Sequence, residues 1–96
     1  MSRLVNITNS VIIMGKYGKG MVVVIDKVEI GQRIARLATE RGWSLRDLER
    51  RSGLTHTALW QITRGAVLPR VESLIMFSVI FSVTTDYILG LSDDSE

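Results

Sequence analysis

The side chains with the most specific hydrogen-bonding chemistry lie between residues 44 and 65, in the segment SLRDLERRSGLTHTALWQITRG. The amide of Gln61 can pair with N6 and N7 of adenine, and Thr57 can donate, accept or place its methyl group on thymine. His56 can donate to guanine N7 or to a phosphate. These side chains therefore offer donors and acceptors of the kind that base edges in a DNA groove can bind.

Groups that suit phosphate surround these side chains. Thr55 and the backbone amides that follow it suit a phosphate oxygen at the start of a helix. Arg46, Arg50 and Arg64 are candidate phosphate contacts, although arginines on a short helix also commonly form an ordinary solvated face. Trp60 has two readings of equal weight: it packs on sugars or thymine methyls at a groove wall, or it covers a neighbouring apolar surface.

Catalytic and metal chemistry finds little support. The chain has no cysteine, which excludes disulfides, thiol nucleophiles and cysteine-ligated metals. His56 is the only histidine, and no nucleophile, base and orienting group stand together in the sequence. The glycine-rich segment GKYGKG is not a P-loop. We therefore expect no enzymatic activity, no cofactor, no metal site and no small-molecule ligand.

The elements that position these residues are helical from Val28 onward. One face of a first helix, which Gly42 ends, is expected to hold Ile30, Ile34, Leu37, Ala38 and Arg41. Further helices are expected at about 45–52, 55–64 and 71–81, and a final short one begins at Thr84 or Thr85 and ends at Gly90. Their boundaries follow from capping residues, turn glycines and Pro69.

The second and third of these helices form the most distinctive unit. Ser44, with Asp47 three residues on, resembles a capping box, and Thr55 caps the next helix. Only Gly53 and Leu54 separate the two helices, so they must cross steeply, as in a helix-turn-helix. Gly53 stands where a positive φ is expected. The apolar positions expected to face each other and the core are Leu48, Leu54, Leu59 and Ile62.

Residues 30–90 resemble the phage-repressor and Cro-type helix-turn-helix proteins, the XRE family. Three segments match in order and spacing: IGQRIARLATERGWS, LRDLERRSGLTHTALWQITRG and LPRVESLIMFSVIFSVTTDYILG. The resemblance implies an all-α, five-helix repressor-like DNA-binding domain whose recognition helix, 55–64, lies in the major groove. It places His56, Thr57 and Gln61 at base-reading positions, with Trp60 beside Gln61.

Several positions depart from the pattern of this family. Leu45 stands where many members carry a glutamine that braces a base-reading side chain or touches phosphate. Glu49 stands where alanine is usual, so it either splays the helix pair or points along its edge. Ala66, Val67 and Leu68 replace the lysine or arginine that often follows Gly65. These departures predict weaker non-specific affinity or a different phosphate grip, not a different fold.

The chain divides into three parts by charge and pattern. Residues 1–27 form a basic N-terminal arm with four cations against one acid, residues 28–90 form the helix-turn-helix domain, and residues 91–96 form an acidic tail. Within the arm, β-branched Val5–Met14 and Met21–Ile25 flank Gly15–Gly20, which predicts a short β-hairpin. A disordered arm is the alternative. A basic body suits a polyanionic partner, although an ordinary solvated surface explains the numbers nearly as well.

The helix expected at 71–81 is apolar on nearly all sides, which one small domain cannot bury alone. Its inward stripe is expected to hold Val71, Leu74, Ile75, Ser78 and Phe81. A second surface is then left to pack on a partner subunit, under the hairpin, or both. That surface comprises Met76, Phe77, Val79 and Ile80. A homodimer would let two reading heads span half-sites of a palindromic operator.

The function that these observations favour is sequence-specific double-stranded DNA binding by a transcriptional regulator, a repressor of a phage-like or mobile-element operon. The alternative is a protein-interaction module, an antitoxin or adaptor, that uses helix 71–81 or the hairpin and binds DNA only secondarily. The apolar runs are too short to cross a bilayer. We therefore expect a cytoplasmic protein without a membrane partner.

Overall fold

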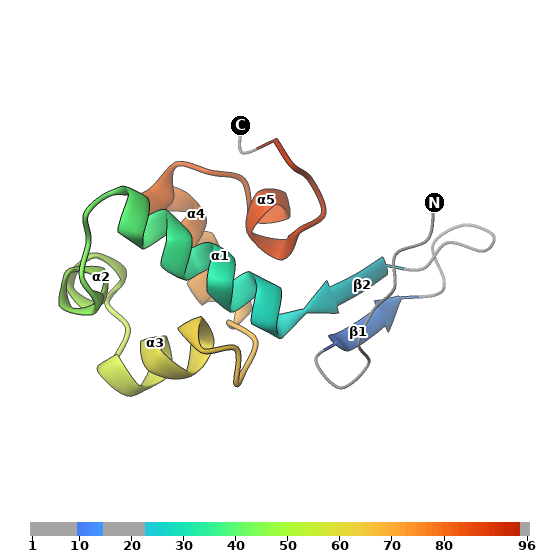
Figure 1. Ribbon diagram of the computed structural model, residues 1–96, viewed down its shortest axis with the longest axis horizontal. Coiled ribbons are helices and arrows are strands. Elements are labelled where there is room, and N and C mark those ends of the chain that lie inside the picture. The colour runs from blue at the N-terminus through green and yellow to red at the C-terminus, as the bar shows by residue number, and fades with distance from the viewer. Residues whose placement is uncertain (1–9, 15–22, 95–96) are drawn as a thin grey trace.

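The computed structural model describes residues 10–14 and 23–94 and contains five helices behind a β-hairpin (Figure 1). The helices are α1 (Lys27–Glu40), α2 (Leu45–Ser52), α3 (His56–Thr63), α4 (Val71–Phe81) and α5 (Thr85–Leu89). The prediction of an all-α, five-helix domain with a short N-terminal hairpin is thereby confirmed. Among the described residues, no helix is long and apolar enough to cross a membrane.

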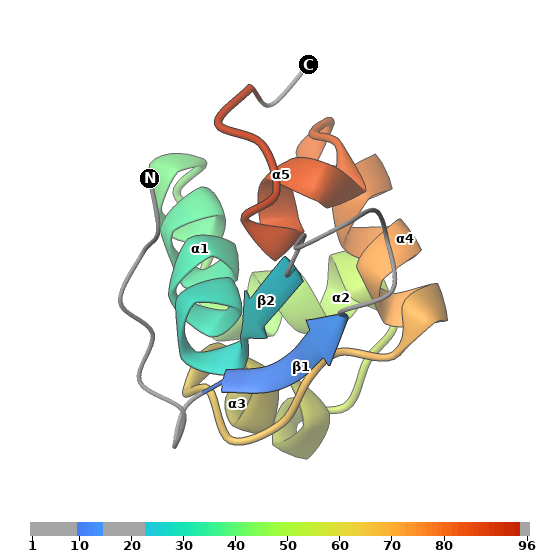
Figure 2. The ribbon, with the colours of Figure 1, turned by 90° about the vertical axis from the view of Figure 1, so that its right-hand side faces the viewer.

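The hairpin pairs β1 (Ser10–Met14) with β2 (Val23–Asp26) in antiparallel fashion. The register matches Met14 with Val23 and Ser10 with Asp26, with one irregularity between Ser10 and Ile12. Figures 1 and 2 show the hairpin at the N-terminal end of α1, at the opposite end of the domain from α2. The rest of the first predicted strand, the predicted turn at Gly15–Gly20 and residues 21–22 of the second predicted strand lie outside the described residues.

β2 passes into α1 without a loop, because Asp26 serves both elements. Asp26 ends the strand, and its carboxylate accepts a hydrogen bond from the backbone amide of Val28 at 2.9 Å, which caps the helix. Ile25, the residue before this cap, is buried against the helical core. The orientation of the hairpin relative to the helices is therefore set by a direct strand-to-helix junction.

The core lies where α1 crosses the other helices, since α1 packs against α3, α4 and α5, and α2 packs against α3 and α4. Its largest fully buried side chains come from all five helices: Ile30, Ile34, Leu48, Leu59, Phe77, Phe81 and Ile88. Trp43 packs against this core and stacks on Phe81, with ring centroids 5.4 Å apart. The inward positions expected for the first three helices are thus confirmed, except Arg41, which is exposed at the C-cap of α1.

The assignment of faces on α4 was right for Phe81 and Val79 but wrong at several other positions. Phe77, expected on the second, outward surface, is fully buried in the core of the domain, and Ile80 is partly buried against that core. Val71 and Ile75, expected inside, are 72% and 52% exposed. Because apolar residues occupy nearly every side of α4, the periodicity gives no preferred direction. The outward apolar surface comprises Val71, Ile75, Met76 and Val79, and we call it the α4 face.

Candidate nucleic-acid interface

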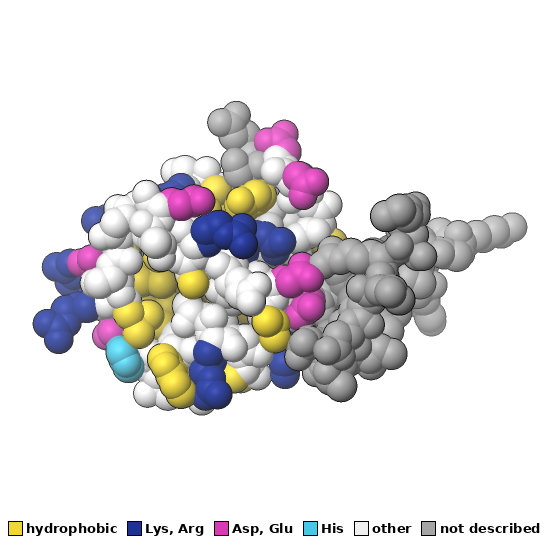
Figure 3. Space-filling model, viewed as in Figure 1, with side chains coloured by type: hydrophobic (Ala, Val, Ile, Leu, Met, Phe, Trp, Pro, Cys, Tyr) yellow, Lys and Arg dark blue, Asp and Glu magenta, His cyan; other side chains and the backbone are white. Residues whose placement is uncertain are grey.

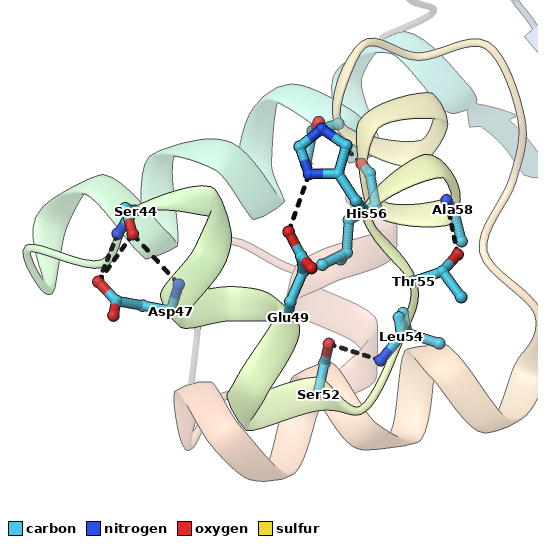
Figure 4. A network of polar contacts seen from close by, with 10 residues as sticks. Ser44, Asp47, Glu49, Ser52, Leu54, Thr55, His56 and Ala58 are labelled. Carbon is cyan, nitrogen blue, oxygen red and sulfur yellow. Dashed lines mark hydrogen bonds and ion pairs between the residues drawn. The ribbon is translucent and has the colours of Figure 1, made fainter.

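The N-terminus of α2 is closed by a reciprocal cap. The backbone amide of Asp47 donates to the Ser44 hydroxyl at 3.1 Å, while the Ser44 amide donates to the Asp47 carboxylate at 2.8 Å (Figure 4). That amide, the Ser44 hydroxyl and Arg50 hold the pKa of the Asp47 carboxyl below its ordinary value. A negative charge near a helix N-terminus is stabilising, and in α2 the Asp47 carboxylate supplies it.

The turn between α2 and α3 is fixed by local hydrogen bonds. Gly53 has φ of 76°, in the left-handed region that favours glycine, which confirms the expectation from sequence. The Ser52 hydroxyl accepts from the Leu54 amide at 3.2 Å, and the Thr55 hydroxyl accepts from the Ala58 amide at 3.1 Å (Figure 4). A turn held this way presents α3 in one orientation relative to α2.

One side of α3 faces the core and the other faces solvent. Leu59 and Ile62 are buried, and they anchor the helix against α1 and α2. The six residues proposed from the sequence to meet DNA at this helix are all exposed: Thr55, His56, Thr57, Trp60, Gln61 and Arg64. The structure therefore brings the predicted base-reading side chains together on one accessible helix face.

Glu49 points along the edge of the helix pair and contacts the start of α3. Its carboxylate lies 2.8 Å from Nδ1 of His56, and the His56 side chain remains 64% exposed (Figure 4). The alternative that Glu49 splays the pair is not seen, because α2 and α3 pack directly together. Sequence reasoning considered both residues and missed that they meet.

The arginines of α2 have different surroundings. The Arg46 side chain is exposed and makes no hydrogen bond, ion pair or ring contact with any residue in the described part of the chain. Arg50 forms an ion pair with Asp47, one turn earlier on the same helix. The guanidinium of Arg51 lies 4.1 Å from the ring centroid of Trp43. Of the three arginines on α2, Arg46 is therefore the one whose side chain contacts no other described residue.

Trp60 and Arg64 form a pair on the exposed side of α3. The guanidinium of Arg64 lies 4.3 Å from the Trp60 ring centroid, and Trp60 is 50% exposed. Such stacking holds the planar cation in place while its edge stays available for hydrogen bonds. Figure 3 shows basic side chains near the α2 and α3 end of the domain, with the single histidine among them.

A hollow of about 620 Å³ lies between α3 and the start of α4. Gln61 lines it from α3, and Arg70, the N-cap residue of α4, lines it from the other side. The sequence analysis did not single out Arg70. Arg70 follows Pro69 just after Ala66–Leu68, where the expected basic residues are absent, and this position could have indicated it. Arg70 lines the same hollow as Gln61 from a different element, and Glu72 lines it as well.

Comparisons with known proteins are consistent with this geometry. A scan against protein-family models and a search of curated proteins each found no match. Among solved structures, the N-terminal DNA-binding domain of SinR from Bacillus subtilis is 31% identical. The match covers 62% of this chain and 88% of that domain, with a TM-score of 0.59. A structure of SinR, described as the master regulator for biofilm formation, in complex with DNA matches at 31% identity.

Two further structures match over a similar extent. The P22 c2 repressor, in complex with synthetic operator 9T, is 25% identical over 62% of this chain and 91% of its own, with a TM-score of 0.59. The restriction-modification controller protein C.AhdI from Aeromonas hydrophila shares the fold at 23% identity, covering 64% of this chain and 92% of its own, with a TM-score of 0.59. Fold, turn geometry and sequence identity agree, and this chain belongs to the XRE-like family of helix-turn-helix DNA-binding domains.

Proposed function

We propose that this protein binds double-stranded DNA in a sequence-specific manner and represses transcription of a phage-like or mobile-element operon. The observation that carries the proposal is the exposed side of α3, where Thr57 and Gln61 project from a helix whose opposite side is anchored by Leu59 and Ile62. A helix held this rigidly can present the same donors and acceptors to every site it meets. The matched SinR and P22 c2 repressor structures are complexes with DNA and with a synthetic operator.

The proposed phosphate contacts surround this reading surface. Arg46 lies on α2, Arg64 on the last turn of α3, and Arg70 at the start of α4. Their charges flank the base-reading side chains from three elements, which suits two backbones at the edges of a groove. Arg50 takes a smaller part, because Asp47 already neutralises it in the free protein.

In-vitro selection from a random DNA pool tests the function directly, and Gln61→Ala is the decisive variant. It should lose preference at one base position and bind the selected site about 1–3 kcal/mol more weakly, because the bidentate contact to a base edge is gone. Fluorescence anisotropy with the selected site and with single-base variants measures both effects. An unchanged base preference would remove Gln61 from the reading surface.

Arg46→Ala is the matched control for that variant. It should weaken binding to all sequences alike and reduce the slope of log affinity against log salt by about 1, because one phosphate contact is lost.

The protein-interaction alternative predicts a different outcome. In that case the unmodified protein would show no salt-sensitive DNA affinity, and an adaptor or antitoxin role would be favoured by the exposed α4 face.

We further propose that a second copy of the chain covers the α4 face, so that two reading heads bind a palindromic operator. Val71 and Val79, two turns apart on the same side of α4, are 72% and 66% exposed and, with Ile75 between them, form a contiguous apolar surface. Sedimentation equilibrium at micromolar concentration should give a dimer, and Val79→Glu should shift it to monomer. Leu91→Glu, which places the same charge on an exposed apolar residue outside α4, should leave the dimer intact. A monomeric unmodified protein would contradict the proposal.

A further inference from the structure

The contact between Glu49 and His56 links a residue of α2 to the first residue of the recognition helix. Nδ1 of His56 and Oε2 of Glu49 are 2.8 Å apart, a normal hydrogen-bond distance. A carboxylate has only acceptor oxygens, so the proton of this bond must belong to Nδ1. In a neutral imidazole one ring nitrogen carries the proton and the other does not. Glu49 therefore leaves Nε2 of neutral His56 without a proton.

The unprotonated nitrogen is the one available to a ligand. Nε2 lies across the ring from Nδ1, on the side away from Glu49, and the side chain is 64% exposed (Figure 4). Glu49 is itself only 31% exposed, so the pair presents the imidazole outward and keeps the carboxylate largely behind it. The surface offered at this point of α3 is thus a hydrogen-bond acceptor.

We propose that Glu49 is a specificity-determining positioning residue: it fixes the tautomer of His56, so that Nε2 accepts a hydrogen bond from an exocyclic amino group in the major groove. Only cytosine N4 and adenine N6 present such a donor there, whereas guanine and thymine present acceptors. This reverses the expectation from sequence that His56 donates to guanine N7. The inference rests on the proposed DNA-binding function and narrows it to two bases at one position.

The pairing also compensates for the absence of a bracing side chain at Leu45. Leu45 is partly buried against the core and has no polar atom to offer a neighbour. Glu49 lies one turn further along α2 and reaches His56 instead. Because a carboxylate can only accept a hydrogen bond, Glu49 determines which nitrogen of His56 carries the proton.

The tautomer can be measured without DNA. Since His56 is the only histidine in the chain, long-range ¹H–¹⁵N correlation spectra report this ring alone. At pH 8.5, where histidine side chains are ordinarily neutral, the unmodified protein should show a protonated Nδ1 and an unprotonated Nε2. Glu49→Ala should return the ring to a mixture of tautomers. Glu40→Gln, which removes a charge from the exposed end of α1, should leave the spectrum unchanged.

The consequence for DNA is tested by selection at the same pH. His56→Ala identifies the base position that His56 reads, as the position where preference is lost. On the strand that His56 contacts, the unmodified protein should prefer adenine or cytosine over guanine or thymine by about tenfold, a typical share of one good base contact. Glu49→Ala should lose this preference at that position alone and keep the one assigned to Gln61. Thermal unfolding of each variant establishes that it is folded.

Three outcomes would overturn the inference. These are a protonated Nε2 in the unmodified protein, guanine selected at the His56 position, and a base preference unchanged by Glu49→Ala. Failure of the underlying function has a different signature. If the unmodified protein selects no DNA at all, the regulator proposal and the base readout fall together, while the NMR spectra still decide whether Glu49 sets the tautomer.

Discussion

Replacing Phe77 with alanine is expected to lower the free energy of unfolding by about 3–5 kcal/mol, the usual cost of removing a buried aromatic ring. Phe77 has no exposed surface, and its ring stacks on Phe81 with centroids 6.1 Å apart. Phe81 in turn stacks on Trp43, so the ring lost from α4 supports contacts that reach the start of α2. Urea denaturation followed by circular dichroism measures the loss.

Val79→Ala is the matched control, two residues further along the same helix. Val79 is 66% exposed, so in the monomer its truncation should change stability by less than about 0.5 kcal/mol. The loss in Phe77→Ala should not depend on protein concentration, whereas any loss in Val79→Ala should grow with concentration if the α4 face forms the dimer. If Phe77→Ala prevents folding altogether, the milder Phe77→Leu should still cost more than Val79→Ala. Equal costs for the two positions would contradict the face assignment.

The helix boundaries could be predicted because their signals are local. Ser44, Gly53 and Thr55 act on backbone groups within four residues of themselves, and each makes the contact that its type favours. The two ends of α4, Val71 and Phe81, follow from the proline before it and the loss of apolar pattern after it. The face of α4 could not be predicted, because it is decided by which side meets α2 and α5.

The exposed side of α3 could likewise be predicted only in part. That His56, Thr57 and Gln61 would be exposed together follows from their spacing on a helix whose other side is apolar. Their polar partners do not follow, because Glu49 reaches His56 only through the crossing angle of α2 and α3. Arg70 was missed for a related reason. It lines the same hollow as Gln61, but from beyond a loop whose path the sequence does not specify.

Gly31→Ala is expected to destabilise the protein by about 3 kcal/mol, at the upper end of the usual cost of overpacking. Gly31 is buried within α1, and a Cβ atom there would lie 2.4 Å from the carbonyl oxygen of Ile62 and 2.9 Å from that of Thr63. Both are backbone atoms at the end of α3, so no side-chain rotation relieves the clash. Intrinsic helix propensity alone would favour alanine over glycine by about 1 kcal/mol, which makes the sign of the effect diagnostic.

The same substitution bears on DNA binding, because the backbone that must move belongs to α3, the proposed recognition helix. Where Gly31→Ala remains folded, α3 is displaced from α1, and the affinity for the selected site should fall together with stability. Gly42→Ala is the matched control: its φ of 72° makes alanine strained, but nothing lies within 4 Å of the added Cβ. It should cost about 1–2 kcal/mol of stability and leave the affinity of the folded protein unchanged. A Gly31→Ala variant that is more stable than the unmodified protein and binds equally well would show that α1 does not hold α3 in place, and that α3 owes its position to the α2 turn alone.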